Sequence, residues 1–193
     1  QCYRFYGRAV KEDPRNVSAL IELARVYGME GKTYDCERAI EAALKISAEP
    51  PARLRVYRIQ LDNISRGAKK QAQQIRRSGE IDRILGNAEN ILAKAREAAA
   101  DLAVSDLLIT ADRIKIFLAI SYLYSIAHDN NKALEYIDES LSTLPGHQDI
   151  FLAKGIILLK NGKFDELSKL FKALSVVDKG ETPEYEDYYI ESL

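Results

Sequence analysis

A spacing of 34 residues relates two stretches in the second half of the chain, and this repetition constrains the fold more than any other feature. One stretch begins at Phe117 and the other at Phe151, and both open with Phe-Leu-Ala. The same offset matches further pairs, namely Tyr124 with Leu158, Ala133 with Leu167, and Ile137 with Phe171. A fixed period of this length predicts a stack of similar units, each packed against its neighbours.

The first half of the chain carries the same pattern. Its residues are Leu20, Leu23, Ala24 and Tyr27, then Gly31-Lys32, then Cys36, Ile40, Ala43, Leu44 and Pro50. The frame extends backwards as well, because Cys2, Tyr6, Ala9 and Pro14 lie 34 residues before Cys36, Ile40, Ala43 and Ala48. Residues 1–14 therefore look like the second helix of a unit whose first helix is absent.

This pattern resembles the tetratricopeptide repeat, W-x2-L-G-x2-Y followed by A-x3-F, then A and P. Leu20 takes the Trp site, Ala24 the Gly site, and Cys36 the small-residue site that opens the second helix. The resemblance covers residues 1–50 and 114–177 well and 51–113 loosely. It implies an all-α fold, an α-solenoid in which antiparallel helix pairs form a right-handed superhelix.

The amino-terminal helix admits two interpretations. A repeat helix without its partner leaves an apolar face exposed, so the chain is expected to be a fragment of a longer repeat protein. The alternative is a natural capping helix. In the first case Phe5, Tyr6 and Val10 would support self-association through the open helix.

Residues 51–103 fit the frame only with an insertion of 18 residues, which is five helical turns. One apolar stripe runs from Leu54 to Ile75 and a second from Ile81 to Leu102, with Ser78-Gly79 as the turn signal between them. We predict one elongated antiparallel αα-hairpin here, with a break near Ser65–Gly67 as the alternative. Ser105 is a plausible N-cap for a further long helix over about 106–127.

The chain is thereby divided into six parts. They are an incomplete repeat (1–15), a repeat-like unit (16–50), the extended hairpin and the start of a long helix (51–113), two more repeat-like units (114–147 and 148–181) and a short acidic helix (182–193). Thr182-Pro183 reads as the N-cap and first position of that last helix.

Composition narrows the classes of protein. Of 193 residues, 47% are hydrophobic, which is enough for a core, while five Pro and ten Gly are too few turn-formers for a β-sandwich. The net charge of −1 gives no overall attraction to nucleic acid or to an anionic membrane. Without a signal peptide or an apolar run of about 18 residues, we expect a cytoplasmic protein.

No residue pattern predicts catalysis, a metal site or a cofactor. Cys2 and Cys36 fall at a small-residue site of successive units, where neighbouring helices are too far apart for a disulfide. His128 and His147 fall in turns without a nucleophile or an orienting partner. No phosphate-binding loop, dinucleotide fingerprint or zinc-protease motif occurs. We expect no enzymatic activity.

The resemblance implies that the first helices of the units line a concave groove for a peptide or a partner helix. The residues assigned to that groove are Arg25, Arg55, Ile59, Asp62, Lys115, Tyr122 and Ile156. Some family members clamp a terminal carboxylate with Lys, Asn and Arg, but the Asn positions are not Asn here. We therefore expect a protein interaction scaffold or regulatory arm.

Two alternatives remain. The chain is a sensor or regulatory domain of a larger multidomain enzyme, or it contacts nucleic acid through a basic tip on the predicted hairpin. That tip contains Arg66, Lys69, Lys70, Arg76 and Arg77. It has no interleaved aromatic residues for stacking on bases, so the sequence favours a protein partner over nucleic acid. Residues 178–193, in contrast, hold six acids and one Lys.

Overall fold

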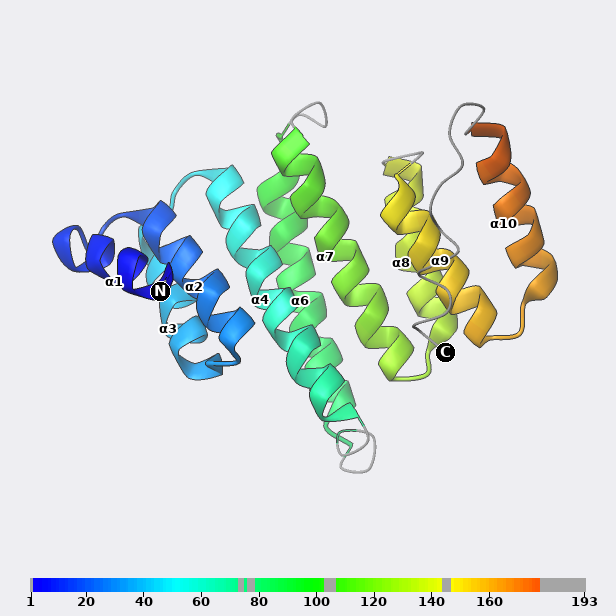
Figure 1. The fold of residues 1–193 in the computed structure, drawn as a ribbon, viewed down its shortest axis with the longest axis horizontal. Coiled ribbons are helices and arrows are strands. Elements are labelled where there is room, and N and C mark those ends of the chain that lie inside the picture. Colours follow the sequence, from blue (N-terminus) through cyan, green and yellow to red (C-terminus); the bar gives the residue numbers. More distant parts are fainter. Residues whose placement is uncertain (1, 73–74, 76–78, 103–106, 144–146, 178–193) are drawn as a thin grey trace.

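The computed structural model describes residues 2–72, 75, 79–102, 107–143 and 147–177, and the secondary structure in these ranges is helical (Figure 1). The all-α prediction is thereby confirmed. None of the described helices combines the length and the apolar character needed to cross a bilayer. The predicted caps Ser78, Ser105 and Thr182, and the predicted acidic helix, lie outside the described residues.

The helices follow one another as neighbours along the chain. Their bounds are α1 (Cys2–Glu12), α2 (Val17–Glu30), α3 (Thr33–Ile46), α4 (Pro50–Lys70), α6 (Ile81–Ala99), α7 (Leu107–Ile126), α8 (Asn130–Thr143), α9 (Gln148–Lys160) and α10 (Phe164–Val177). The start and end of α7 agree with the helix predicted over 106–127.

Local sequence signals set several helix ends. The Asn16 side chain accepts a hydrogen bond from the Ala19 N–H and so caps α2. At the other end of α2, Gly31 adopts the left-handed conformation with φ of 74°, which a residue with a side chain adopts only at a cost. Pro50 opens α4, where its missing N–H and fixed φ suit the first turn.

Helices adjacent in sequence pack as pairs, α2 with α3, α4 with α6, α7 with α8, and α9 with α10. The first helices of these pairs also contact one another in succession, α2 with α4, α4 with α7, and α7 with α9. Figure 1 shows these pairs side by side along the long axis of the molecule, with α1 at one end and α10 at the other.

Within the described part of the chain, three hydrophobic cores hold the helices together. The first core joins α2, α3 and α4, and the central core joins α4, α6 and α7. The third core joins α7, α8, α9 and α10. Helix α4 serves two of them, because Val56 and Ile59 enter the first core while Leu54, Tyr57 and Leu61 enter the central core. A 3.6-residue period places these two sets on different faces of one helix.

The 34-residue frame puts Ala24, Ala43, Ala133 and Gly155 at small-residue sites, and it predicts that all four are buried. Ala24, Ala43 and Ala133 are at most 1% exposed, and Gly155 is buried on α9. This prediction is confirmed. Cys36 is also fully buried, and a Cβ added to Gly28 would lie 3.5 Å from its Sγ atom. The packing role assigned to this small-residue site is therefore evident for Cys36.

Helix α4 runs for 21 residues without the break considered near Ser65–Gly67. The buried Ser65 hydroxyl donates to the Ala119 carbonyl of α7 at 3.3 Å, so the position is anchored inside the helix. A Cβ added to Gly67 would meet no neighbouring atom, so packing does not require a glycine at this position of the helix. Helix α6 packs against α4 and spans 19 residues.

At the amino-terminal end, α1 packs against α2 and Val10 contacts the first core. Phe5, by contrast, is 72% exposed. Of the three residues considered for self-association, Val10 is thus used within the chain, Phe5 faces outward, and the half-buried Tyr6 contacts the Phe5 ring edge-on.

Candidate groove between α2, α4 and α7

A groove of about 490 Å³ lies where the first helices of three successive pairs meet. Helix α2 contributes two side chains, and α4 and α7 contribute four each. The lining residues are Arg25, Met29, Arg58, Asp62, Ser65, Arg66, Lys115, Leu118, Ala119 and Tyr122. Four of them carry a positive charge and one carries a negative charge, so the groove is basic.

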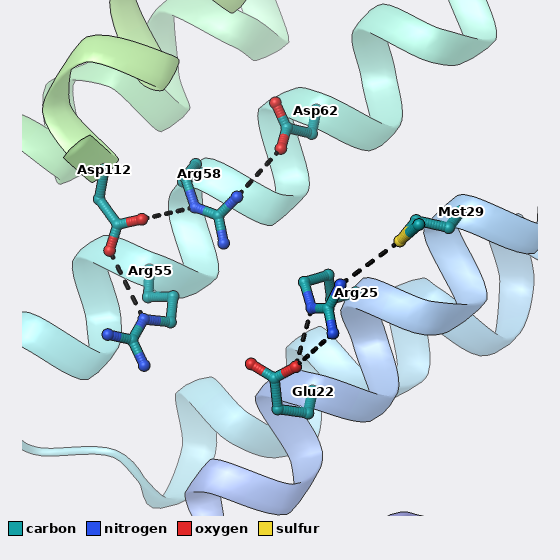
Figure 2. A network of polar contacts seen from close by, with 7 residues as sticks. All are labelled: Glu22, Arg25, Met29, Arg55, Arg58, Asp62 and Asp112. Carbon is teal, nitrogen blue, oxygen red and sulfur yellow. Dashed lines mark hydrogen bonds and ion pairs between the residues drawn. The ribbon is translucent and has the colours of Figure 1, made fainter. Parts of the chain in front are cut away.

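A buried ion-pair network lies beside this groove and links α4 to α7 (Figure 2). Arg58 Nε lies 2.6 Å from Asp112 Oδ1, an ion pair rather than a directed hydrogen bond, and Arg58 also donates to Asp62 at 3.3 Å. Arg55 Nε approaches the other oxygen of Asp112 at 3.5 Å. The side chains of Arg58 and Asp112 are only 11% and 12% exposed, so their charges depend on each other.

Burial raises the pKa of Asp62 above its ordinary value, while the cations Arg58, Arg66 and Lys115 act in the opposite direction. Arg66 and Lys115 are both exposed, and neither has a carboxylate within ion-pair distance in the part of the chain that the structure describes. These two cations therefore lack a dedicated partner of opposite charge.

On the opposite wall, Arg25 is held along α2. It donates to Glu22 at 2.8 Å and approaches the Met29 sulfur at 3.5 Å, as Figure 2 shows. Around the groove, the five cations Arg25, Arg55, Arg58, Arg66 and Lys115 face the three carboxylates Glu22, Asp62 and Asp112. The excess of two positive charges corresponds to Arg66 and Lys115.

Apolar surface accompanies these charges. Met29 is 61% exposed at one edge, and Leu118 and Tyr122 are half-buried on α7. An exposed thioether and a partly exposed aromatic ring offer contact area to an apolar or aromatic side chain. The groove thus combines unpartnered positive charge with an apolar wall.

The structure brings together four of the seven residues that the sequence assigned to a partner-binding groove, namely Arg25, Asp62, Lys115 and Tyr122. Arg55 lies beside the groove, with its guanidinium turned to Asp112. Ile156, half-buried on α9, does not line it.

The assignment of Ile59 to the groove surface was wrong. Ile59 is 3% exposed and packs in the first core against α2 and α3. It follows Arg58 directly, and one step along a helix turns the side chain by about 100°. Arg58 therefore faces α7 while Ile59 faces the first core.

Sequence reasoning missed Arg58, Ser65, Met29, Leu118 and Ala119 as lining residues. The signal for two of them was present, because Arg58 and Ser65 stand four residues before and three after Asp62 and so share its helix face. Arg66 was assigned to the hairpin tip but lines the groove.

The rest of the predicted basic tip is described only in part. Lys69 and Lys70 are exposed in the last turn of α4, and Arg76 and Arg77 lie outside the described residues. The Lys70 ammonium reaches the end of α2, where it would lie 3.3 Å from a Cβ added to Gly31. A cation there suits the negative end of the α2 dipole, which is a structural use of this residue.

The cysteine and histidine residues form no metal site with acids among the described residues. Burial raises the pKa of the Cys36 thiol to about 11, so this free cysteine is a poor nucleophile. His128 lies in the turn after α7 with φ of 63°, and His147 directly precedes α9. The side chain of Cys2 lies outside the described residues.

One further polar cluster joins α6, α7 and α8. The Glu89 carboxylate accepts hydrogen bonds from Tyr124, from Lys132 at 2.8 Å and from Tyr136 at 3.4 Å. The Lys132 ammonium also lies 4.7 Å from the centre of the Tyr124 ring, which stacks on Tyr136. Every member of this cluster has a partner within the chain, so we interpret it as a structural clasp.

The hydrogen bonds from Lys132 and Tyr124 hold the pKa of Glu89 below its ordinary value of 4.5. A carboxyl whose pKa is lowered by folding stabilises the fold above its unfolded-state pKa and loses that contribution as the pH falls through the folded-state pKa. We therefore expect Glu89→Gln to lower the free energy of unfolding by about 1 kcal/mol at pH 7, because the 40% exposed side chain is screened by solvent. The deficit should shrink below pH 4.5.

Urea unfolding at pH 7 and at a series of values below pH 4.5 measures this difference. The matched control is Glu97→Gln, an exposed glutamate on the same helix, which should unfold like the unsubstituted chain. A deficit for Glu89→Gln that stays constant down to pH 3 would contradict the clasp.

No protein-family model matches the chain, and its sequence matches no curated protein.

Proposed function

We propose that this protein is an interaction module that binds a segment of another protein in the groove between α2, α4 and α7. The observation that carries the proposal is the convergence of Arg66 and Lys115, two exposed cations with no carboxylate at ion-pair distance among the described residues, beside the apolar side chains of Met29, Leu118 and Tyr122. This combination suits an acidic segment that also carries an apolar or aromatic side chain.

The arrangement of the helices supports the same proposal. We interpret the chain as an α-solenoid of the tetratricopeptide type, in which α2, α4, α7 and α9 are the first helices of successive units. The contacts of α2 with α4, α4 with α7 and α7 with α9 agree with that interpretation. The groove then lies on the row of first helices, where this architecture presents its binding surface.

Binding of fluorescein-labelled synthetic peptides tests the proposal. Three 14-residue probes share the same Tyr and Leu positions and differ only in having Glu, Gln or Lys between them. Fluorescence polarisation with the full chain should show micromolar affinity for the acidic probe and at least tenfold weaker binding of the other two, because positive potential selects the complementary charge. Failure of the acidic probe to bind, both to the full chain and to a full chain whose carboxyl-terminal acids are neutralised, would overturn the proposal.

Charge-reversal variants locate the binding surface. Arg66→Glu combined with Lys115→Glu should weaken the acidic probe at least tenfold, since it replaces attraction by repulsion at the groove. The matched control is Lys45→Glu with Lys94→Glu, which changes net charge equally at exposed positions on α3 and α6. Equal loss in both pairs would show that overall charge, rather than the groove, governs binding.

A parallel titration with labelled duplex and single-stranded DNA and RNA examines the nucleic-acid alternative. We expect no micromolar binding at physiological salt, because the net charge of the chain is −1. Clear binding that is lost in Lys69→Gln with Lys70→Gln would favour nucleic acid over a protein segment.

A further inference from the structure

The chain contains a segment with the chemistry that the groove selects. Residues 178–193 carry six acids and one Lys, and the acids alternate with aromatic residues over the stretch Glu184–Glu191, which reads Glu-Tyr-Glu-Asp-Tyr-Tyr-Ile-Glu. Its charge is opposite to that of the groove, and its Tyr side chains match the apolar wall made by Met29, Leu118 and Tyr122. We infer that this carboxyl-terminal segment occupies the α2–α4–α7 groove of its own chain.

The inference rests on the proposed function, since it names an occupant for the same groove. The groove and the carboxyl-terminal segment carry opposite net charges. Around the groove, the cations outnumber the carboxylates by two, and this excess corresponds to Arg66 and Lys115. The segment has six acids and one Lys, so its side chains carry a net charge of −5. Bringing the two together reduces unbalanced charge of both signs, with an attraction that salt weakens.

The segment is long enough to reach the groove. It follows Val177 at the end of α10, which packs on α9, and α9 in turn contacts α7. Neighbouring helix axes lie about 8–10 Å apart, so two such steps cover about 20 Å. An extended chain advances about 3.3 Å per residue, so residues 178–184 span about 23 Å. This length is enough for the aromatic residues that follow Glu184 to reach α7.

An intramolecular occupant competes with partners at a high effective concentration. A tether of this length gives an effective concentration of about 1 mM, so an intrinsic Kd near 100 μM would leave the groove about nine-tenths occupied. An external ligand would then bind about tenfold more weakly than it binds an open groove. The segment would act as a built-in competitor that a tighter-binding partner must displace.

Photo-crosslinking on the full chain tests where the segment lies. Tyr188 is replaced by p-benzoylphenylalanine, whose excited carbonyl abstracts hydrogen readily from thioether side chains, and Met29 is the single Met of the chain. Irradiation of a dilute sample should yield a cross-link between position 188 and Met29 within one chain, identified by mass spectrometry of the digest. The yield should fall at least fivefold in Arg66→Glu with Lys115→Glu and in 1 M salt.

The control places the same photoreactive residue at Phe164, an exposed position on α10 that is remote from α2 along the row of helices, which should give no cross-link to Met29. Cross-links from position 188 to residues outside the groove would overturn the inference. A product of doubled mass, with position 188 joined to Met29 of a second chain, would overturn the intramolecular form.

The peptide assay separates this inference from the proposed function. The full chain with Glu184→Gln, Glu186→Gln, Asp187→Asn and Glu191→Gln should bind the acidic probe about tenfold more tightly than the unsubstituted chain. Equal micromolar affinity of the two chains would overturn the inference and leave the proposed function intact. Absence of binding to both chains would overturn the proposed function itself.

Discussion

Replacing Asp112 by Ala is expected to lower the free energy of unfolding by about 3 kcal/mol. Asp112 and Arg58 pair at 2.6 Å with side chains that are 12% and 11% exposed, so removing the carboxylate leaves a guanidinium charge with little access to water. Asp62 remains as a second acceptor at 3.3 Å, which keeps the loss near the lower end of the range for broken buried pairs. Chemical denaturation followed by circular dichroism measures the change.

Two further variants make this expectation specific to the buried pair. Arg58→Met combined with Asp112→Leu should recover most of the loss, because apolar residues of similar size often replace a buried pair without penalty. Asp138→Ala, which removes a 55% exposed partner of Lys154, should change stability by less than about 1 kcal/mol. If Asp112→Ala and Asp138→Ala have equal effects, the network between α4 and α7 does not stabilise the fold as inferred.

Leu61→Ala is the second substitution with a large expected effect. Leu61 is fully buried in the central core between α4, α6 and α7, and truncating such a side chain costs about 2–5 kcal/mol through lost burial and the cavity that remains. A thermal melt and a urea titration measure the loss. Leu108→Ala is the control, because Leu108 is 66% exposed and its truncation should shift stability by less than about 0.5 kcal/mol.

Much of the fold followed from periodicity. The apolar stripes predicted the positions of α4 and α6, and the 34-residue frame predicted the burial of Ala24, Ala43, Ala133 and Gly155. These features depend on residues close in sequence, where helical geometry converts spacing directly into a face.

The groove was predictable only in part, for a physical reason. Arg25, Asp62, Lys115 and Tyr122 could be assigned because each occupies a comparable face of a first helix. Whether a side chain is free or already paired depends on what another helix presents to it. The sequence does not show that Arg55 and Arg58 converge on Asp112, or that Arg66 turns to the groove.

Ile59 illustrates the same limit on a smaller scale. Helix α4 is flanked by two cores, so apolar residues on both of its sides are buried, and the exposed strip between them is narrow. Periodicity alone indicates where an apolar stripe lies, but not that a second neighbour covers the adjacent face.

The position of α4 between two cores has a mechanical consequence. Helix α2 packs in the first core and α7 in the central core, while the groove has one wall on each. A ligand that touches both walls would act as a brace across α4 and stiffen the molecule against bending and twisting at that point. The elasticity of the chain under load would then report whether the groove is occupied.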